Sequence, residues 1–341
     1  MSGKVEKFEN SQVKTHLNLL AEGISPPNRV SPLFGSFNAN SWFSGSALSN
    51  GFEMDSAQHV FLPSCVVTTM LSLADRLSVS RASKYLALEL FERFIVRHAI
   101  QQRGSASRPR RSCTERAIGA RIERQLPLVA LACFTLSAKN TDHYHLVFPT
   151  SALKLLEESG ERHSADDLLG AELLVARTLQ HELYVRTVHE YVCLFLEELR
   201  TESGSPLALP DVVNASREQC ERVLDLFYLW RDEIYALLLE RRAEPPSTAR
   251  NSSAPRATDA ASWPAWRPLL ERQPQLAPEW HAMQNDRWLA AAAVVVAAVG
   301  TISAPAAPHA LNLLVAAPSV RLQAELVQLL ASCILKMPQL H

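Results

Sequence analysis

Two His-Glu pairs, at residues 181–182 and 189–190, begin the H-E-x-x-H pattern of a zinc protease. That pattern needs a second histidine one helical turn after the first, so that both imidazoles reach one ion. Val185 and Cys193 occupy those positions. The sequence also contains no G-x-S-x-G elbow, no Walker loop and no G-x-G-x-x-G turn between a strand and a helix. We therefore expect no catalytic residues, no cofactor and no small-molecule substrate.

A further candidate for metal chemistry is the segment TDHYHLVFPT, in which Asp142, His143 and His145 lie close together. Neighbouring loop residues rarely surround one ion without ligands from elsewhere in the chain. The six cysteines are scattered and form no C-x-x-C pair, which argues against a zinc site or a disulfide framework. We expect no bound metal, and reduced, buried thiols in an intracellular protein.

The strongest local charge lies in residues 101–124, where seven arginines stand against two glutamates, a net charge of +5. The arginines are Arg103, Arg108, Arg110, Arg111, Arg116, Arg121 and Arg124. Such a basic patch is suited to DNA phosphates or an acidic partner. A solvated loop that leads into the next helix explains the same residues. Both interpretations stay open at this point.

The element that must position these residues is the stretch LVALACFTLSAKN, residues 128–140. It is apolar on nearly every side, which predicts a helix surrounded by other helices. Pro127 stands where proline often begins a helix, so we expect this central helix to start there. Lys139 closes it and complements the carbonyl end of the helix.

Amphipathic helices are predicted on both sides of this central helix. Ser80 is expected to cap one whose stripe ends at His98, a helix-end histidine with no ligand role. Another opens at Asp166 or Asp167, with Glu172 at the edge of its stripe. Its stripe is Leu169, Leu173, Ala176, Leu179 and Leu183. The other predicted helices are 60–77, 151–158, 185–199, 214–242, 288–303 and 321–335.

The composition is that of a mostly helical globular protein, with 47% hydrophobic residues and a formal net charge of −1. We predict a flexible arm over 1–58, a helical domain over 59–184 with its arginine-rich insertion at 101–124, and a C-terminal helical domain over 185–341 with a linker at 243–280. The N-terminus is polar where a secretory signal is apolar. The uncharged stretch 288–304 has about the length of a membrane span. Its alanines and the prolines that follow favour an interior helix, so no membrane association is expected.

The order of these helices resembles the five-helix box of the cyclin family. LALELFERFI (86–95) is similar to the second cyclin helix, LVALACFTLSAK (128–139) to the third, and DDLLGAELLVARTLQHEL (166–183) to the fifth. VRTVHEYVCLFLEEL (185–199) is similar to the start of the second half. The resemblance implies an all-α fold: a five-helix cyclin-box bundle followed by a second, partial or divergent helical bundle.

In cyclins that activate kinases, the lysine that ends the third helix and a glutamate in the fifth contact the kinase. The matching residues here are Lys139 and Glu172. The alternative is structural, with Glu172 paired to a nearby arginine such as Arg177. Cyclins that dock substrates also carry M-R-x-x-L-x-x-W in the first helix. The matching positions, Leu62, Pro63, Val66 and Thr69, lack the arginine and the tryptophan.

Residues 62–95 are most similar to a cyclin group associated with crossover maturation in meiotic recombination. The resemblance implies a non-enzymatic regulatory protein of the nucleus, and also of the cytoplasm, that acts through protein partners on the cyclin-box face. Those partners are a cyclin-dependent kinase or proteins of a recombination complex. The first alternative is a subunit that binds and activates a cyclin-dependent kinase in cell-cycle control. The second is a DNA-binding factor of cyclin fold.

Overall fold

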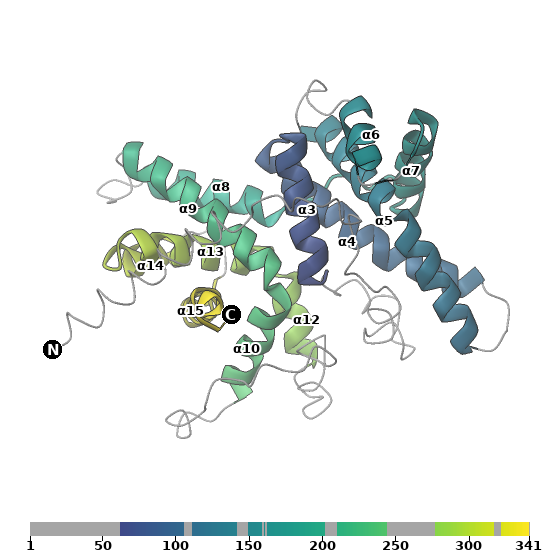
Figure 1. Cartoon of the computed structure of the whole chain (residues 1–341). Coiled ribbons are helices and arrows are strands. Elements are labelled where there is room, and N and C mark those ends of the chain that lie inside the picture. Colours follow the sequence, from purple (N-terminus) through teal and green to yellow (C-terminus); the bar gives the residue numbers. More distant parts are fainter. Residues whose placement is uncertain are drawn as a thin grey trace. The chain divides into compact units, whose positions relative to one another are not determined.

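A computed structural model of the chain describes residues 62–105, 111–141, 149–158, 160, 162–201, 210–243, 277–316 and 322–340. These residues form twelve α-helices and no strand (Figure 1), which confirms the all-α class. The arm predicted over 1–58, most of the predicted linker and the segment with Asp142, His143 and His145 lie outside the described residues.

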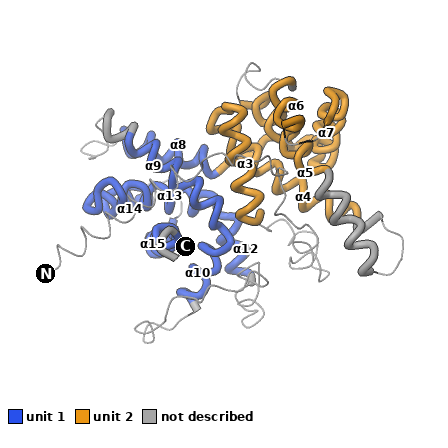
Figure 2. Tube along the Cα trace, viewed as in Figure 1, with its two compact units in different colours: residues 1–26, 188–261, 265–341 blue, residues 27–187, 262–264 orange. Residues whose placement is uncertain are grey.

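The chain divides into two compact units (Figure 2), each of which is described here by itself. The boundary lies between Thr187 and Val188. The described helices of unit 2 are α3 (Ser64–Leu77), α4 (Arg81–Ser105), α5 (Arg111–Thr141), α6 (Pro149–Glu158) and α7 (Ala165–Thr178). This is the order of five helices that the sequence predicts for this region; their assignment to a cyclin box stays a prediction.

The centre of unit 2 is α5, which packs against α4, α6 and α7. Every side chain from Val129 to Ala138 is buried, as predicted for a helix enclosed by others. The predicted start at Pro127 is wrong, because α5 begins at Arg111 and carries the proline inside it. The arginines, glutamates and alanines before Pro127 favour helix, and Leu126 is buried just before it. Local propensity and packing therefore outweigh the one backbone hydrogen bond that proline removes.

Helix α4 has the predicted start and the predicted buried stripe. The Ser83 N–H donates to the Ser80 hydroxyl at 3.1 Å, which confirms Ser80 as the cap. The stripe residues Ala87, Leu90, Phe91, Phe94, Ile95 and His98 are all buried. The prediction that His98 ends its helix is wrong, since α4 continues to Ser105. The His98 ring stacks on Phe94, with 5.0 Å between ring centroids, and belongs to the core.

Helix α7 begins at a different residue from the predicted one and buries a different side. Its N-cap is Ser164, and Asp167 completes a capping box in which the two residues bond each other's backbone N–H groups. The residues that α7 buries include Leu168, Ala171, Glu172, Val175 and Ala176, whereas Leu169 and Leu173 are exposed. The helix ends at Thr178, so the predicted stripe to residue 183 is also too long. Most residues after the cap are apolar, and so periodicity alone does not select the buried side.

The capping box should make the stability of unit 2 depend on pH. The Ser164 backbone N–H, followed by its hydroxyl, donates to Asp167 and holds the pKa of that carboxyl below its usual value of about 3.9. The contribution is therefore complete above about pH 4 and is lost as the pH falls through the lower folded pKa. Asp167→Asn should lower the urea midpoint near neutral pH, and this difference should shrink below about pH 4. Asp166→Asn, in the same turn, is the control; a constant difference for Asp167→Asn would contradict the prediction.

Unit 1 contains the other described helices. They are α8 (Val188–Thr201), α9 (Pro210–Leu229), α10 (Arg231–Ala243), α12 (Ala277–Asn285), α13 (Arg287–Ile302), α14 (Ala306–Ala316) and α15 (Ala324–Leu340). The segment 214–242, predicted as one helix, is divided at Trp230 into α9 and α10. Helix α14 was not predicted, and it contains Pro308. This proline lies in the first turn of α14, where its missing N–H has no intrahelical partner to lose.

Helix α13 is the interior helix of unit 1. Every residue from Leu289 to Val299 is buried, and α8, α9, α14 and α15 pack around the helix. None of the described helices has by itself the length and apolar character of a membrane span. The neighbouring helices Pro278–Asn285 and Arg287–Ile302, bent by 66°, meet the criteria of length and composition only as a pair.

Candidate partner-binding site

The site begins with an ion pair between two helices of unit 2. The Lys139 ammonium donates to Oε2 of Glu172 at 2.5 Å, which joins the last turn of α5 to the middle of α7. The structure thus brings together the two residues selected from the sequence, and Glu172 pairs with Lys139 instead of Arg177. The Glu172 side chain is 9% exposed and that of Lys139 44%. The carboxylate is therefore inside the protein, whereas the lysine still faces solvent.

Beside this ion pair, α7 presents a face made of exposed residues. We call it the α7 surface, and it consists of Asp166, Leu169, Gly170, Leu173 and Arg177. Leu169 is 53% exposed and Leu173 is 45% exposed. Sequence reasoning assigned both leucines to the core and so missed this surface. The sequence did contain one signal for this surface. Asp166 and Arg177 fall on the same side of the helix as the two leucines, and charged residues mark the side of a helix that faces water.

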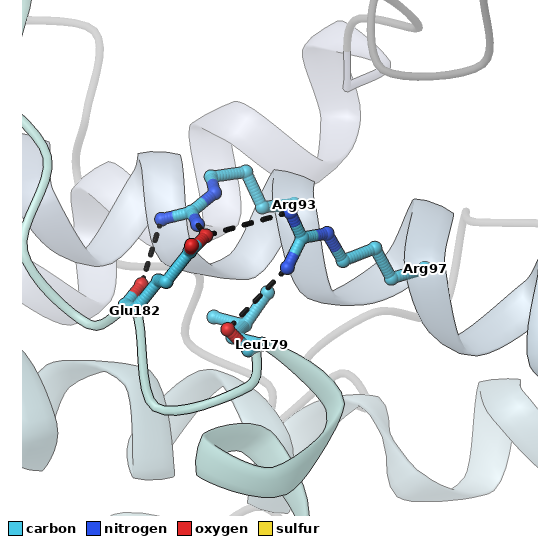
Figure 3. Close-up of polar contacts among 4 residues, drawn as sticks. All are labelled: Arg93, Arg97, Leu179 and Glu182. Carbon is cyan, nitrogen blue, oxygen red and sulfur yellow. Dashed lines mark hydrogen bonds and ion pairs between the residues drawn. The ribbon is translucent and has the colours of Figure 1, made fainter. Parts of the chain in front are cut away.

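The end of α7 is held by two arginines of α4 (Figure 3). Arg93 donates to the carbonyl oxygen of Glu182 at 3.0 Å, and Arg97 donates to that of Leu179 at 3.3 Å. Both guanidinium groups also lie within 3.6 Å of the Glu182 carboxylate. Gln180 and His181, between these anchors, adopt left-handed backbone conformations with φ of 56° and 65°. The arginines therefore fix a tight turn and place cations at the negative end of α7.

Comparison with curated proteins finds two relatives with the same name. The chain is 26% identical over 187 residues to cyclin N-terminal domain-containing protein 1 of mouse, and 27% identical over 189 residues to that of human. Each match covers 52% of this chain and 54% of the relative. Both matches support a cyclin-like relationship. No family model matches the chain, and no solved structure matches it.

The chain thus spans about half the length of the curated relatives it matches. In and just before α3, the residues at the positions expected for the substrate-docking motif serve the fold. Leu62 and Val66 are buried, and the Thr69 hydroxyl donates to the carbonyl of Cys65 at 2.9 Å. Pro63 is the N-cap of α3. These positions therefore present neither the arginine nor the tryptophan of a docking surface.

The described part of the arginine-rich stretch is helical, so the interpretation as a solvated loop is wrong there. Arg103 lies in the last turn of α4, and the first half of α5 carries four more: Arg111, Arg116, Arg121 and Arg124. Arg108 and Arg110 lie outside the described residues. The structure does not describe the side chains of these arginines. The basic patch therefore stays a prediction.

Each of the two His-Glu pairs contributes one residue to contacts within the fold. Glu182 binds Arg93 and Arg97, and the buried His189 lies 3.7 Å from the sulfur of Cys193, one turn along α8. In the described part of the chain, no group of three or more metal-ligating side chains comes together. Burial raises the pKa of the Cys133 thiol, and no disulfide joins the described cysteines.

Proposed function

We propose that this cyclin-like chain is a non-enzymatic regulatory protein of meiotic recombination, which acts in crossover maturation in the nucleus. It works by binding a protein partner at Lys139 and the α7 surface. The observation that carries this proposal is that α7 both binds Lys139 through the buried Glu172 and exposes two leucines to solvent. The meiotic assignment is supported by the resemblance of residues 62–95 to a cyclin group associated with crossovers.

The chemistry of this surface suits a protein partner. An ammonium has three N–H donors, and the Glu172 carboxylate accepts one of them from Lys139. The others are available to carbonyl oxygens of a partner. Leu169 and Leu173 stand one turn apart on the same side of α7, where their burial contributes the non-directional part of binding. In such a complex, the hydrogen bonds of Lys139 orient the partner, and the leucines provide the apolar area that is buried.

The test compares partner retention by matched variants of the full chain. Tagged wild-type protein, the double variant Leu169→Ser with Leu173→Ser, and the control Leu194→Ser are used for quantitative purification from meiotic tissue. Leu194 is a good control because it is 50% exposed on a helix of unit 1. Recombination proteins should be retained by the wild type and the control and be lost from the double variant. Equal retention by all three would contradict the proposal.

The alternative, activation of a cyclin-dependent kinase, is favoured by the match of Lys139 and Glu172 to residues that contact kinases in cyclins. Stimulation of a purified kinase distinguishes the two functions. An exchange of the two charges, Lys139→Glu with Glu172→Lys, tests the site, because it keeps an internal ion pair and inverts the charge offered to a partner. If wild-type protein stimulates a purified kinase and the exchange variant does not, the alternative replaces the proposal. Absence of stimulation by the wild type favours the proposed non-enzymatic role.

A further inference from the structure

The 182–187 segment, which leads from unit 2 to the first helix of unit 1, lies in neither a helix nor a turn. Exposure alternates along it: Glu182, Tyr184 and Arg186 are exposed, whereas the two residues between them are half-buried. A period of two is typical of an extended chain, in which every second side chain points to the same side. Glu182, Tyr184 and Arg186 therefore share the solvent-facing side of this segment.

Tyr184 differs from the other tyrosines that the structure describes. It is 59% exposed and lies outside any helix. The others lie in helices: Tyr85, Tyr228 and Tyr235 are buried, and Tyr191 is half-buried with its ring packed on a tryptophan. A protein kinase must reach the acceptor hydroxyl and hold the chain on either side of it, which an exposed segment without regular structure permits. Among the described tyrosines, only Tyr184 meets this requirement.

Two arginines of α4 bind the residue two positions before this tyrosine (Figure 3). The guanidinium groups of Arg93 and Arg97 lie within 3.6 Å of the Glu182 carboxylate. Their side chains are 21% and 29% exposed, so packing restricts them while they still reach solvent. An extended chain advances about 3.3 Å per residue, so Tyr184 follows Glu182 by about 7 Å. A phosphate on the Tyr184 ring would therefore lie within reach of two cations that already bind an anionic side chain.

We infer that Tyr184 is a phosphorylation site of a protein tyrosine kinase, and that the phosphate binds Arg93 and Arg97 in competition with Glu182. In the transfer, the Oη atom of Tyr184 forms a bond to the γ-phosphorus of ATP, and the bond from that phosphorus to the β–γ bridging oxygen breaks. The Oη proton passes to a base of the kinase, and ADP leaves.

The chemistry of the phosphate explains why it competes with a carboxylate. It carries a charge of about −1.5 to −2 and three strong acceptor oxygens, so it gains charge-assisted hydrogen bonds from the two guanidinium groups. Modification should thus order the 182–187 segment. The inference goes beyond the proposed function and does not depend on the partner that binds at Lys139.

The first experiment measures where a kinase modifies the protein. The full chain with Tyr144→Phe, which removes the tyrosine outside the described residues, is incubated with magnesium ATP and the catalytic domain of a tyrosine kinase of broad sequence preference. Quantitative mass spectrometry follows each remaining tyrosine. Tyr184 should be phosphorylated at least about tenfold faster than Tyr191, because modification within α8 requires local opening of that helix. Equal rates at the two residues, or no modification of Tyr184, would overturn the assignment.

The second experiment uses native protein, purified with a phosphatase inhibitor from cells that express it. Mass spectrometry should detect the peptide with Tyr184 in a phosphorylated form, which disappears on treatment with a tyrosine phosphatase. If this peptide is detected only without phosphate, Tyr184 is not a phosphorylation site in those cells and the inference fails.

The role of the arginines is tested by hydrogen exchange of the amides at 179–187, before and after phosphorylation. In the wild type, phosphorylation should slow this exchange about tenfold. The slowing should be lost in Arg93→Gln with Arg97→Gln. It should persist in the control Arg76→Gln, because Arg76 is an exposed arginine of unit 2 that pairs with Glu158 instead. Each variant is compared with its own unphosphorylated form, so an effect of the substitution on folding is subtracted.

Glu182→Gln provides a second variant, in which both arginines stay in place and the competing carboxylate is removed. Phosphorylation should slow exchange in this variant by at least as much as in the wild type. No slowing in the wild type, undiminished slowing in the double arginine variant, or loss of the slowing in Glu182→Gln would each contradict binding of the phosphate by Arg93 and Arg97.

Discussion

Replacement of Phe134 by alanine should lower the free energy of unfolding by about 3–5 kcal/mol. Phe134 is fully buried in the middle of α5, the helix against which α4, α6 and α7 pack. Truncation removes the transfer free energy of the ring and leaves a cavity between helices that relax only partly. Urea denaturation followed by circular dichroism measures the loss. Because the chain has two units, hydrogen exchange of the α5 amides assigns the loss to unit 2.

Leu169→Ala is the matched control for this experiment. It removes a large apolar side chain from the same unit, but at a position that is 53% exposed. The expected change is within about 0.5 kcal/mol, because exposed substitutions away from special contacts have small effects. Comparable losses for Leu169→Ala and Phe134→Ala would show that α7 buries the face expected from its sequence. A small loss for Phe134→Ala would show that α5 is not the centre of the unit.

Replacement of Lys139 by methionine should cost about 2 kcal/mol. It leaves the buried Glu172 carboxylate without its cation, and an uncompensated buried charge is strongly destabilising. The value lies below that of a fully buried pair because the lysine side chain is 44% exposed. Glu172→Gln should cost less, about 0.5–1 kcal/mol, since water still solvates the lysine that remains. Urea midpoints of the two variants measure this asymmetry.

The charge-exchange variant, Lys139→Glu with Glu172→Lys, completes this comparison of variants. It should recover part of the stability that Lys139→Met loses, because an ion pair is again possible between α5 and α7. Equal losses for Lys139→Met and Glu172→Gln would mean that the carboxylate is as well solvated as the lysine. That result would contradict the burial of Glu172, on which the proposed site depends.

Local patterns were sufficient for some parts of the fold. The cap of α4 at Ser80 agrees with the structure, and its predicted stripe is buried, although Leu86, Leu88, Glu89 and Val96 outside that stripe are buried as well. For α7 several stripes of apolar residues fit the same period, and the structure buries a different one from the stripe predicted. The start of α5 was missed for another reason. A proline is a common first residue of a helix, but packing can hold one inside.

The sequence by itself determined the all-α class, the burial of residues 129–138, the selection of Lys139 and Glu172, and the cyclin-like resemblance. Each of these depends on residue types within one segment or on their order along the chain. Only the tertiary structure decided that Lys139 pairs with Glu172, that Arg93 and Arg97 hold the turn after α7, and that Leu169, Gly170 and Leu173 face outward. These facts join residues 33 to 89 positions apart or depend on the rotation of a helix against its neighbours. Local periodicity carries no information about either, because both are set by packing between helices.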